Sequence, residues 1–255
     1  MTFAPCAVIP VYNHHASLPR VVAALRAHGL PVILVDDGSD APTRAVLETQ
    51  AALDGVTCRH LSANQGKGAA VMAGLQLAQA QGFTHALQVD ADGQHDLADA
   101  PRLLALAKAH PDGLVSGRPC YDASVPAVRF YGRYLTHALV WLETLSLTLR
   151  DSMCGFRVYP LAASLALARR VAIGARMDFD TDIMVRLYWA GTDSVFLPTH
   201  VHYPEDGISH FRMGADNARM AWLHVRLVAG MLMRAPRLVA RSRARRKPAA
   251  RKVED

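Results

Sequence analysis

Short apolar runs alternate with longer segments rich in Ala and Leu over the first 120 residues, and this alternation constrains the fold more than any other feature of the chain. The apolar runs are hydrophobic at consecutive positions, which is typical of parallel strands that helices cover on both faces. Strands that alternate with helices form a doubly wound α/β sheet. We predict strands at 6–11, 31–36, 56–61, 84–89 and 113–117, and helices at 16–28, 42–53, 67–81 and 98–109.

The second half of the chain has longer helical segments. An apolar, aromatic helix is predicted at 128–148, and helices at 160–169 and 180–190 precede a strand at 194–199. The polar, glycine-bearing segment 151–157 has the composition of a loop that lines a site. The chain shows neither repeat nor linker, and 255 residues of which 51% are hydrophobic fit one α/β domain, to which we assign residues 1–213.

Four cysteines are scattered along the chain without a Cys-x-x-Cys pair, and strand-like sequence follows directly after the first five residues. We therefore expect no secretory signal peptide and predict reduced thiols in a cytoplasmic protein. The same cysteine pattern argues against a zinc site.

The basic charge of the chain lies at its C-terminal end. Residues 234–252 contain nine Lys or Arg, whereas residues 1–233 carry 19 basic and 20 acidic side chains. A solvated tail and an anionic membrane surface are both consistent with this distribution. Nucleic acid is disfavoured as a partner, because no aromatic residues for base stacking are interleaved with the tail charges.

Residues 214–241 form a predicted amphipathic helix that is strongly apolar. Its arginines recur near multiples of 3.6 residues and interrupt the apolar runs too often for a membrane-spanning helix. We expect a helix peripheral to the membrane, with Trp222 inserted and the arginines at the headgroups. A helix packed on the core or in a dimer is the alternative, and residues 242–255 are predicted to be a disordered basic tail. The arginines are Arg219, Arg226, Arg234, Arg237 and Arg241.

Two carboxylates and an amide follow the predicted strand 84–89, at Asp90, Asp92 and Gln94. Oxygen ligands of this kind suit Mg²⁺ or Mn²⁺, which in turn holds the phosphate oxygens of a diphosphate. Asp92 and Gln94 are the favoured ligands, whereas Asp90 would ligate the metal, contact a ribose or hold the loop. An N-capping turn before the helix at 98–109 is the alternative to a metal site.

Polar residues also follow two other predicted strands, at Asn13 and at Asp36 and Asp37. Ligands of doubly wound sheets bind outside the carboxyl ends of the strands, so these side chains are expected to converge with Asp90 on a nucleotide. Lys67 stands at the start of the helix 67–81, where it would face phosphate or remain a solvated lysine. The glycine spacing around Lys67 is not that of a Walker loop.

Arginines are the third component of the predicted site. Arg118 follows the strand 113–117, and Arg129 and Arg133 lie shortly after it. The fork of a guanidinium matches two phosphate oxygens, so we expect at least one of the three to bind phosphate.

Five motifs together resemble those of family 2 glycosyltransferases, in order and in spacing, over about residues 5–210. Within that family the chain is similar to the dolichol-phosphate-mannose-synthase-like branch, whose Asp-x-x-(Ser/Cys)-Gly-Phe-Arg segment resembles residues 151–157. The motifs are Pro10–Asn13, Asp36–Ser39, Asn64–Gly68, Asp90–Gln94 and Ser116–Arg118.

The resemblance implies a glycosyltransferase A-type α/β domain that binds a nucleotide sugar, requires a divalent metal and transfers the sugar with inversion. It assigns Pro10, Tyr12, Asp36 and Asp37 to the nucleoside, and Asp90, Asp92 and Gln94 to the metal and the diphosphate. A lipid-linked or otherwise apolar acceptor, including polyprenyl phosphate, and a location on the inner face of the cell membrane are also implied. The donor base, UDP or GDP, and the oligomeric state stay open.

The same resemblance places an acidic residue on the helix 180–190. We favour Asp182 as the base for the acceptor, with Asp180 second, because an inverting displacement ordinarily deprotonates a hydroxyl. A lipid phosphate needs little deprotonation, in which case the carboxylate would only position groups. Complementation of the helix dipole at the helix start is the alternative for both residues.

The chain departs from the branch at residues 205–212. His210 stands where the branch has a lysine, and we expect His210 and Arg212 to contact phosphate. A surface histidine is the alternative reading of His210.

Two other classes of protein compete with the glycosyltransferase. A sugar-1-phosphate nucleotidyltransferase is disfavoured, because residues 5–10 lack its glycine-rich signature. A non-catalytic nucleotide-sugar-binding protein would have lost the metal carboxylates, which this chain retains.

Overall fold

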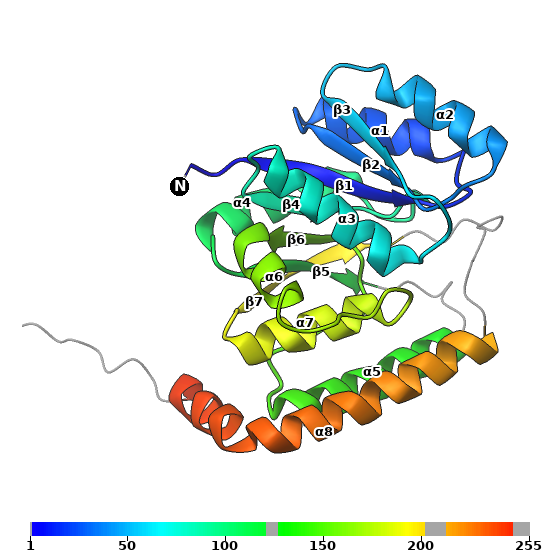
Figure 1. The fold of residues 1–255 in the computed structure, drawn as a ribbon. Helices are drawn as coiled ribbons and strands as arrows, with labels where there is room; N and C mark the ends of the chain where they lie inside the picture. Colours follow the sequence, from blue (N-terminus) through cyan, green and yellow to red (C-terminus); the bar gives the residue numbers. More distant parts are fainter. Residues whose placement is uncertain (1, 121–126, 202–212, 247–255) are drawn as a thin grey trace, which may run out of the picture.

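A single seven-stranded sheet forms the centre of the computed structural model, which describes residues 2–120, 127–201 and 213–246 (Figure 1). His210 and Arg212, both predicted to bind phosphate, lie outside these described residues. In chain order the strands are β1 (Pro5–Val11), β2 (Val32–Asp36), β3 (Val56–His60), β4 (His85–Gln88), β5 (Leu114–Cys120), β6 (Arg157–Pro160) and β7 (Ser194–His200).

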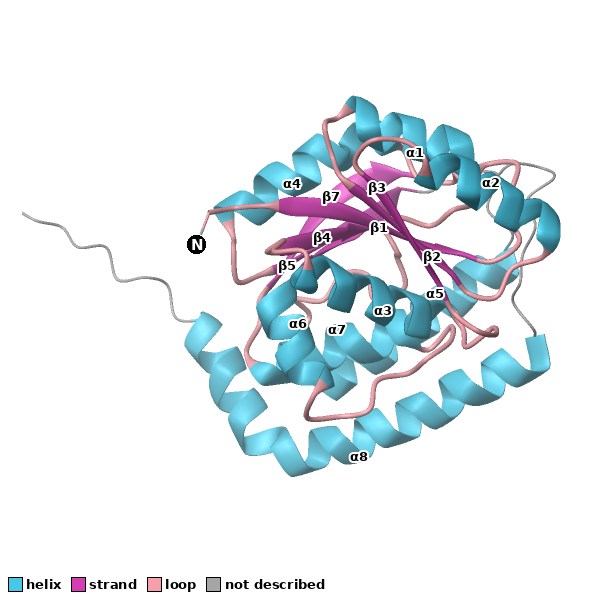
Figure 2. Ribbon diagram, turned by 45° about the horizontal axis from the view of Figure 1, so that its top comes forward, coloured by secondary structure: helices cyan, strands magenta, loops and turns pink. Residues whose placement is uncertain are grey.

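Helices cover both faces of the sheet, as the pattern of apolar strands predicted (Figure 2). Each helix boundary lies within a few residues of the predicted one, except the ends of α5 and α8. α5 stops at Thr144 because Leu145 adopts a left-handed conformation with φ of 49°, and α8 continues to Arg246. The helices are α1 (Leu18–Ala27), α2 (Ala41–Ala51), α3 (Lys67–Ala80), the 3₁₀ turn η1 (Leu97–Asp99), α4 (Ala100–Ala109), α5 (Ala127–Thr144), α6 (Leu161–Ala168), α7 (Phe179–Ala190) and α8 (Met213–Arg246).

The strand order is β3-β2-β1-β4-β6-β5-β7, and every pairing is parallel except those of β6. β6 runs antiparallel between β4 and β5, with Leu87 opposite Val158 and Val115 opposite the same residue. The sequence did not predict this strand, because Arg157–Pro160 is four residues long and includes an arginine and a proline. The insertion brings the end of segment 151–157 into the middle of the sheet.

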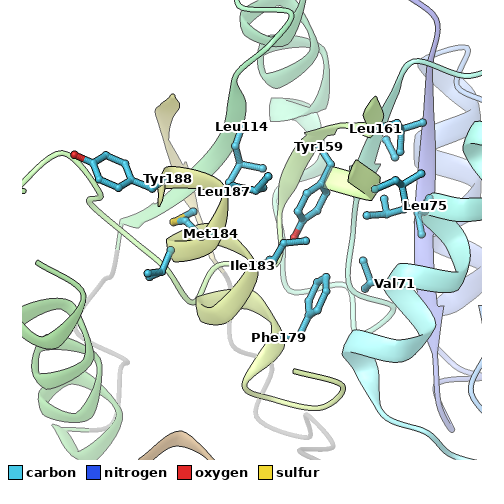
Figure 3. Close-up of a cluster of buried hydrophobic side chains, with 14 of the residues drawn as sticks. Val71, Leu75, Leu114, Tyr159, Leu161, Phe179, Ile183, Met184, Leu187 and Tyr188 are labelled. Carbon is cyan, nitrogen blue, oxygen red and sulfur yellow. The ribbon is translucent and has the colours of Figure 1, made fainter. Parts of the chain in front are cut away.

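Side chains of β1 alternate between two hydrophobic cores, one on each face of the sheet. Ala7 and Ile9 pack into a core with α1, α2 and α4, whereas Cys6 and Val8 pack into a core with α3, α6 and α7. Figure 3 shows part of the second core, where residues of β6, α6, α7 and α3 face one another. They are Val71, Leu75, Tyr159, Leu161, Phe179, Ile183, Met184 and Leu187.

Helices α5 and α8 run side by side along the second core (Figure 1). The buried hydrophobic side chains of α8 are Leu223, Leu227, Met231 and Leu238, so the helix is part of the folded domain. It continues to Arg246, which corrects the prediction that disorder begins at residue 242. No helix in the described part of the chain is long and apolar enough to cross a bilayer.

Two arginines fasten α8 to α7. The Arg234 guanidinium lies 4.8 Å from the centre of the Trp189 ring, and Arg241 lies 4.4 Å from the Tyr188 ring while donating a hydrogen bond to the carbonyl of Gly191. Cations at the C-terminus of a helix satisfy its last carbonyls and its dipole. The prediction that all five arginines form one headgroup stripe is therefore wrong for Arg234 and Arg241.

Candidate functional site

The carboxyl ends of β1, β2 and β4 meet at one edge of the sheet, and the polar residues predicted there are brought together. Pro10 is buried within β1, and the half-buried Tyr12 follows that strand directly. Asn13 has a φ of 57°, and its side-chain oxygen accepts a hydrogen bond of 2.8 Å from the backbone of Asp40. Asn13 therefore fastens the loop after β1 to the loop after β2.

Asp36 is fully buried at the end of β2, and its carboxylate contacts Ser39, His60 and, at 3.6 Å, Arg44 Nε. Its Oδ1 accepts a hydrogen bond of 2.8 Å from the backbone of Ser39, and its Oδ2 lies 2.9 Å from His60 Nδ1. Burial acts to raise the pKa of Asp36, but the bonds from His60 and Ser39 outweigh it and hold the pKa below its usual value. Sequence reasoning missed His60, whose only signal was its place at the end of β3.

Asp37 holds the loop that leads into α3. Its two carboxylate oxygens accept hydrogen bonds of 2.7 Å and 2.8 Å from the backbone amides of Gln65 and Gly66. Burial raises the pKa of Asp37, and the two amides act in the opposite direction. This geometry gives Asp37 a structural role, and a ribose hydroxyl would have to share oxygens that already accept these bonds.

Lys67 forms ion pairs with two carboxylates from different elements. Its Nζ lies 2.9 Å from Asp90 Oδ1 and 3.0 Å from Asp180 Oδ2. Burial acts to lower the pKa of Lys67, but Asp180 and Asp90 raise it above its usual value. Burial acts to raise the pKa of Asp90, but Lys67 holds that pKa well below the usual range. The predicted solvated lysine is thus contradicted, and in this structure Lys67 faces carboxylates.

A fully buried arginine lies beneath this cluster. Arg157 Nη1 donates a hydrogen bond of 2.5 Å to the carbonyl of Asp180 and lies 3.8 Å from its Oδ1. Gln88 Nε2 lies 3.4 Å from the same oxygen, and the Tyr159 hydroxyl donates to Gln88 Oε1 at 3.0 Å. The cationic side chains of Lys67 and Arg157 therefore lie against the carboxylates of Asp90 and Asp180. An unpaired buried charge at this place would cost several kcal/mol.

Segment 151–157 lies directly against this cluster, as its composition predicted. A Cβ atom on Gly155 would be 2.7 Å from Asp90 Oδ2 and 2.8 Å from Lys67 Nζ, so only glycine fits without displacing the ion pair. Asp151 shapes the segment, because its Oδ1 accepts hydrogen bonds of 2.9 Å and 2.8 Å from the amides of Met153 and Cys154.

The three predicted metal ligands line one small pocket of about 110 Å³, together with Arg133. Burial and the neighbouring Asp90 carboxylate raise the pKa of Asp92, whose Oδ1 accepts a hydrogen bond of 3.0 Å from the amide of Gln94. Two nearby carboxylates that repel each other, with an amide oxygen beside them, are a donor set that fits Mg²⁺ or Mn²⁺. The pocket residues therefore suit a divalent cation.

His95 is a further residue of this pocket that the sequence did not single out. Its ring stacks on Phe156 with the ring centres 5.1 Å apart, and its Nε2 lies 3.7 Å from Asp90 Oδ2. The residue follows Gln94 directly, and no pattern in the sequence distinguishes it from a surface histidine.

The three predicted phosphate arginines are separated by the fold. Arg133 lines the pocket, and its Nε donates a hydrogen bond of 2.7 Å to Asp151 Oδ2, which also lies 3.4 Å from His137 Nε2. Burial opposes ionisation of Asp151, but His137 and Arg133 lower its pKa to about 2. Arg118 lines a different cavity, so the expectation that it joins this site is not met. Arg129 belongs to α5, and its side chain is outside the described part.

The two acidic residues of α7 have different surroundings. Asp180 faces Lys67 in the cluster described above, whereas Asp182 is fully buried, accepts a hydrogen bond of 2.9 Å from the amide of Gly174 and pairs with Arg186. The geometry thus favours Asp180 over Asp182, the reverse of the order that the sequence suggested.

Fold and site together define a class of protein. The sheet is that of a nucleotide-binding α/β domain, and the pocket at its carboxyl edge offers a divalent cation two carboxylates beside an arginine. Residues 6–175 match the sequence profile of Glycosyl transferase family 2. The chain belongs to this family and is a glycosyltransferase, as its motifs predicted.

Two relatives place the chain within the family. It is 26% identical over 234 residues to the polyprenol monophosphomannose synthase of Mycolicibacterium smegmatis, with 86% of this chain and 84% of the relative covered. It is 28% identical over 202 residues to the undecaprenyl-phosphate mannosyltransferase of Micrococcus luteus, with 75% and 80% covered. These similarities confirm the dolichol-phosphate-mannose-synthase-like branch.

A solved structure shares the fold. The glucosyl-3-phosphoglycerate synthase of Mycobacterium tuberculosis, crystallised with Mn²⁺, uridine-diphosphate-glucose and phosphoglyceric acid, superimposes with a TM-score of 0.62 over 90% of this chain and 79% of that chain. Its sequence identity to this chain is 15%, so the comparison concerns the fold.

Proposed function

We propose that this glycosyltransferase moves a sugar, with inversion and with a divalent metal, from a UDP- or GDP-sugar to polyprenyl phosphate. The observation that carries the proposal is the pocket in which Asp90, Asp92 and Gln94 meet Arg133. Relatives whose names specify polyprenol and undecaprenyl phosphate support the acceptor class. Mn²⁺ beside a nucleotide sugar in the structural neighbour supports the metal requirement.

The pocket residues have different proposed roles in binding the donor. When bound, Mg²⁺ or Mn²⁺ at Asp92 and Gln94, with Asp90 beside them, would neutralise the charge that develops on the diphosphate leaving group. Arg133 adds a positive charge at the same pocket, and Asp151 holds its guanidinium in place through a hydrogen bond of 2.7 Å. At the other strand ends, the half-buried Tyr12 is assigned to the nucleoside, whereas the fully buried Asp36 holds the loop through Ser39 and His60.

We assign to Asp180 the role of a positioning residue for Lys67 rather than that of a base. A polyprenyl phosphate is already an anion at neutral pH and attacks without losing a proton. Asp180 is paired with Lys67 at 3.0 Å and with Arg157 at 3.8 Å, so it fixes the ammonium beside Asp90. Asp182 then serves the packing of α7 through Arg186.

The α5 and α8 helices supply the proposed membrane contact. Leu142 of α5 is 48% exposed, and Trp222, Leu232 and Met233 of α8 are 62%, 65% and 77% exposed. Exposed apolar side chains gathered on neighbouring helices mark an interaction surface, and Trp with Leu and Met suits the boundary of lipid headgroups and acyl chains. Docking by these helices to the inner face of the membrane brings a lipid-linked acceptor to the sheet edge.

Nucleotide-dependent thermal stability tests the donor assignment. The melting temperature is measured with UDP, GDP, CDP and dTDP, with and without Mn²⁺. A nucleotide at one hundred times its Kd stabilises the native state by about 2.7 kcal/mol, which is a rise of roughly 5–10 °C for a domain of this size. We expect UDP or GDP to act, and only with metal.

The Asp92→Asn variant completes this test. It should abolish both the metal-dependent stabilisation and sugar transfer to polyprenyl phosphate, with the fold intact. Asp112→Asn, which changes an exposed carboxylate outside the pocket, is the matched control. Normal turnover by Asp92→Asn would refute the metal site.

Liposome binding tests the membrane contact. The double change Trp222→Ser and Leu232→Ser should lower co-sedimentation with liposomes, whereas Leu53→Ser, which alters an exposed leucine far from α5 and α8, should not. Equal partitioning of both variants would contradict the membrane contact. The exposed apolar face of α5 and α8 would then be assigned to a contact between protein subunits.

A further inference from the structure

A second cavity, of about 740 Å³, lies at the β7 edge of the sheet. Its walls come from β5, β7, the loop after α5 and the end of α8, through Arg118, Phe196, Arg150 and Ser242. A cavity of this size is within the range that holds small-molecule ligands. The cavity shares no lining residue with the pocket at Asp90, because Arg118 and Pro119 point to opposite faces of β5.

The lining of this cavity is positive and rich in hydroxyl groups. Neither the Arg118 nor the Arg150 side chain has a hydrogen bond or an ion pair with another described residue. No carboxylate is among the described residues of the lining, and Asp193, which precedes β7, is already paired with Arg241 at 2.7 Å. The hydroxyl groups are those of Ser146, Thr148, Ser194 and Ser242.

This combination is suited to a phosphate group. A guanidinium offers two parallel donors to phosphate oxygens, and two free guanidinium groups beside hydroxyl donors leave a strong positive field uncompensated. The buried Oγ of Ser194 has no hydrogen-bond partner among the described residues, so it is a donor that a ligand would satisfy.

The rim of the cavity is apolar and borders the proposed membrane face. Leu147 is 68% exposed on the loop directly after α5, and Phe196 and Pro198 of β7 also line the cavity. Leu142, which is 48% exposed, lies two residues before the end of α5, and α8 borders the cavity through Ser242. A ligand with an anionic head and an apolar chain matches both parts of the surface.

We propose that this cavity binds the phosphate headgroup of an anionic membrane lipid, at a site separate from the transfer pocket. The headgroup lies between Arg118 and Arg150, and the acyl chains leave over Leu147 toward the exposed face of α5 and α8. The inference rests on the proposed membrane contact, which it deepens by naming the lipid class. Such a site orients the domain on the membrane, so that the sheet edge with Asp90 faces the lipid-linked acceptor.

Vesicle binding distinguishes a built site from diffuse attraction. Affinity for vesicles of phosphatidylcholine with phosphatidylglycerol is measured for Arg150→Gln and for Arg237→Gln, a matched change at an exposed arginine of α8 outside the cavity. Loss of one surface charge weakens binding about fivefold, whereas loss of a charged hydrogen-bonding partner weakens it by at least about tenfold. We expect the smaller loss for Arg237→Gln and the larger one for Arg150→Gln. Equal losses overturn the proposal.

A soluble ligand separates the lipid headgroup from free phosphate. A short-chain phosphatidylglycerol, below its micelle concentration, should bind the wild-type protein and lose at least about tenfold in affinity in Arg150→Gln. Competition by inorganic phosphate at equal concentration would overturn the lipid assignment. Should Arg150→Gln fail to fold, Arg150→Lys keeps the charge without the fork and should still bind the lipid more weakly than wild type.

The donor assay keeps this proposal distinguishable from the proposed function. Metal-dependent stabilisation of the wild-type protein by UDP or GDP reports on the pocket at Asp92, and lipid binding reports on the cavity at Arg150. Nucleotide stabilisation without Arg150-dependent lipid binding overturns only the cavity site. Lipid binding without nucleotide stabilisation overturns only the donor assignment.

Discussion

Asp180 and Asp182 lie two residues apart on α7. We expect Asp182→Asn to lower mainly the stability of the protein and Asp180→Asn to lower mainly its activity. Asp182→Asn removes a fully buried carboxylate from its pair with the partly buried Arg186, and breaking a buried pair costs about 3–5 kcal/mol. Asp180→Asn leaves Lys67 paired with Asp90 at 2.9 Å, so the free energy of unfolding should fall by only about 1–3 kcal/mol. The melting temperature should fall by at least roughly 6 °C in the first variant and by less in the second.

Activity should change in the reverse order. Without the Asp180 carboxylate the Lys67 ammonium is free to shift, and misplacement of a group by about 1 Å costs about a hundredfold in rate. Asp182→Asn should keep transfer per folded molecule within a few-fold of wild type. The measurement is sugar transfer to polyprenyl phosphate, with the folded fraction taken from circular dichroism. A hundredfold loss in Asp182→Asn, with Asp180→Asn near wild type, would refute the assignment of the two residues.

Three further predictions concern neighbouring contacts. Gly155→Ala should lower transfer strongly while melting within a few degrees of wild type, because its Cβ would stand 2.7 Å from Asp90 Oδ2; activity near wild type would contradict the packing argument. Asp151 has a pKa lowered to about 2, so it stabilises the fold by roughly 2 kcal/mol above about pH 4 and loses this contribution as the pH falls toward 2. The difference in urea unfolding between wild type and Asp151→Asn should therefore vanish at acid pH. Arg241→Ala should release the end of α8 from α7 and speed limited proteolysis near residue 241, with Arg243→Ala as the unaffected control.

Most of the fold could be predicted because it depends on local pattern. Consecutive apolar residues at 6–11 and 84–89 mark buried parallel strands, and the helices between them follow from Ala- and Leu-rich segments. β6 could not be predicted, because a four-residue strand with Arg157 and Pro160 is stabilised by pairing with β4 and β5 rather than by its own composition.

The sequence predicted which residues belong to the site better than it predicted which of them contact one another. Asp90, Asp92 and Gln94 line one pocket with Arg133, as their positions at strand ends and after β5 suggested. That Lys67 pairs with Asp180, across 113 positions of sequence, depends on how α7 packs against α3, and no local pattern encodes it. His60 and His95 escaped notice for the same reason.

Sequence alone determined the α/β alternation, the family and the chemical groups available at the sheet edge, since each follows from residues close together in the chain. Tertiary structure decided which of those groups meet. Residues two apart on a helix point about 200° away from each other, so only packing could select Asp180 over Asp182. Neighbours on a strand point to opposite faces, so only the sheet could turn Arg118 away from the pocket that Pro119 lines.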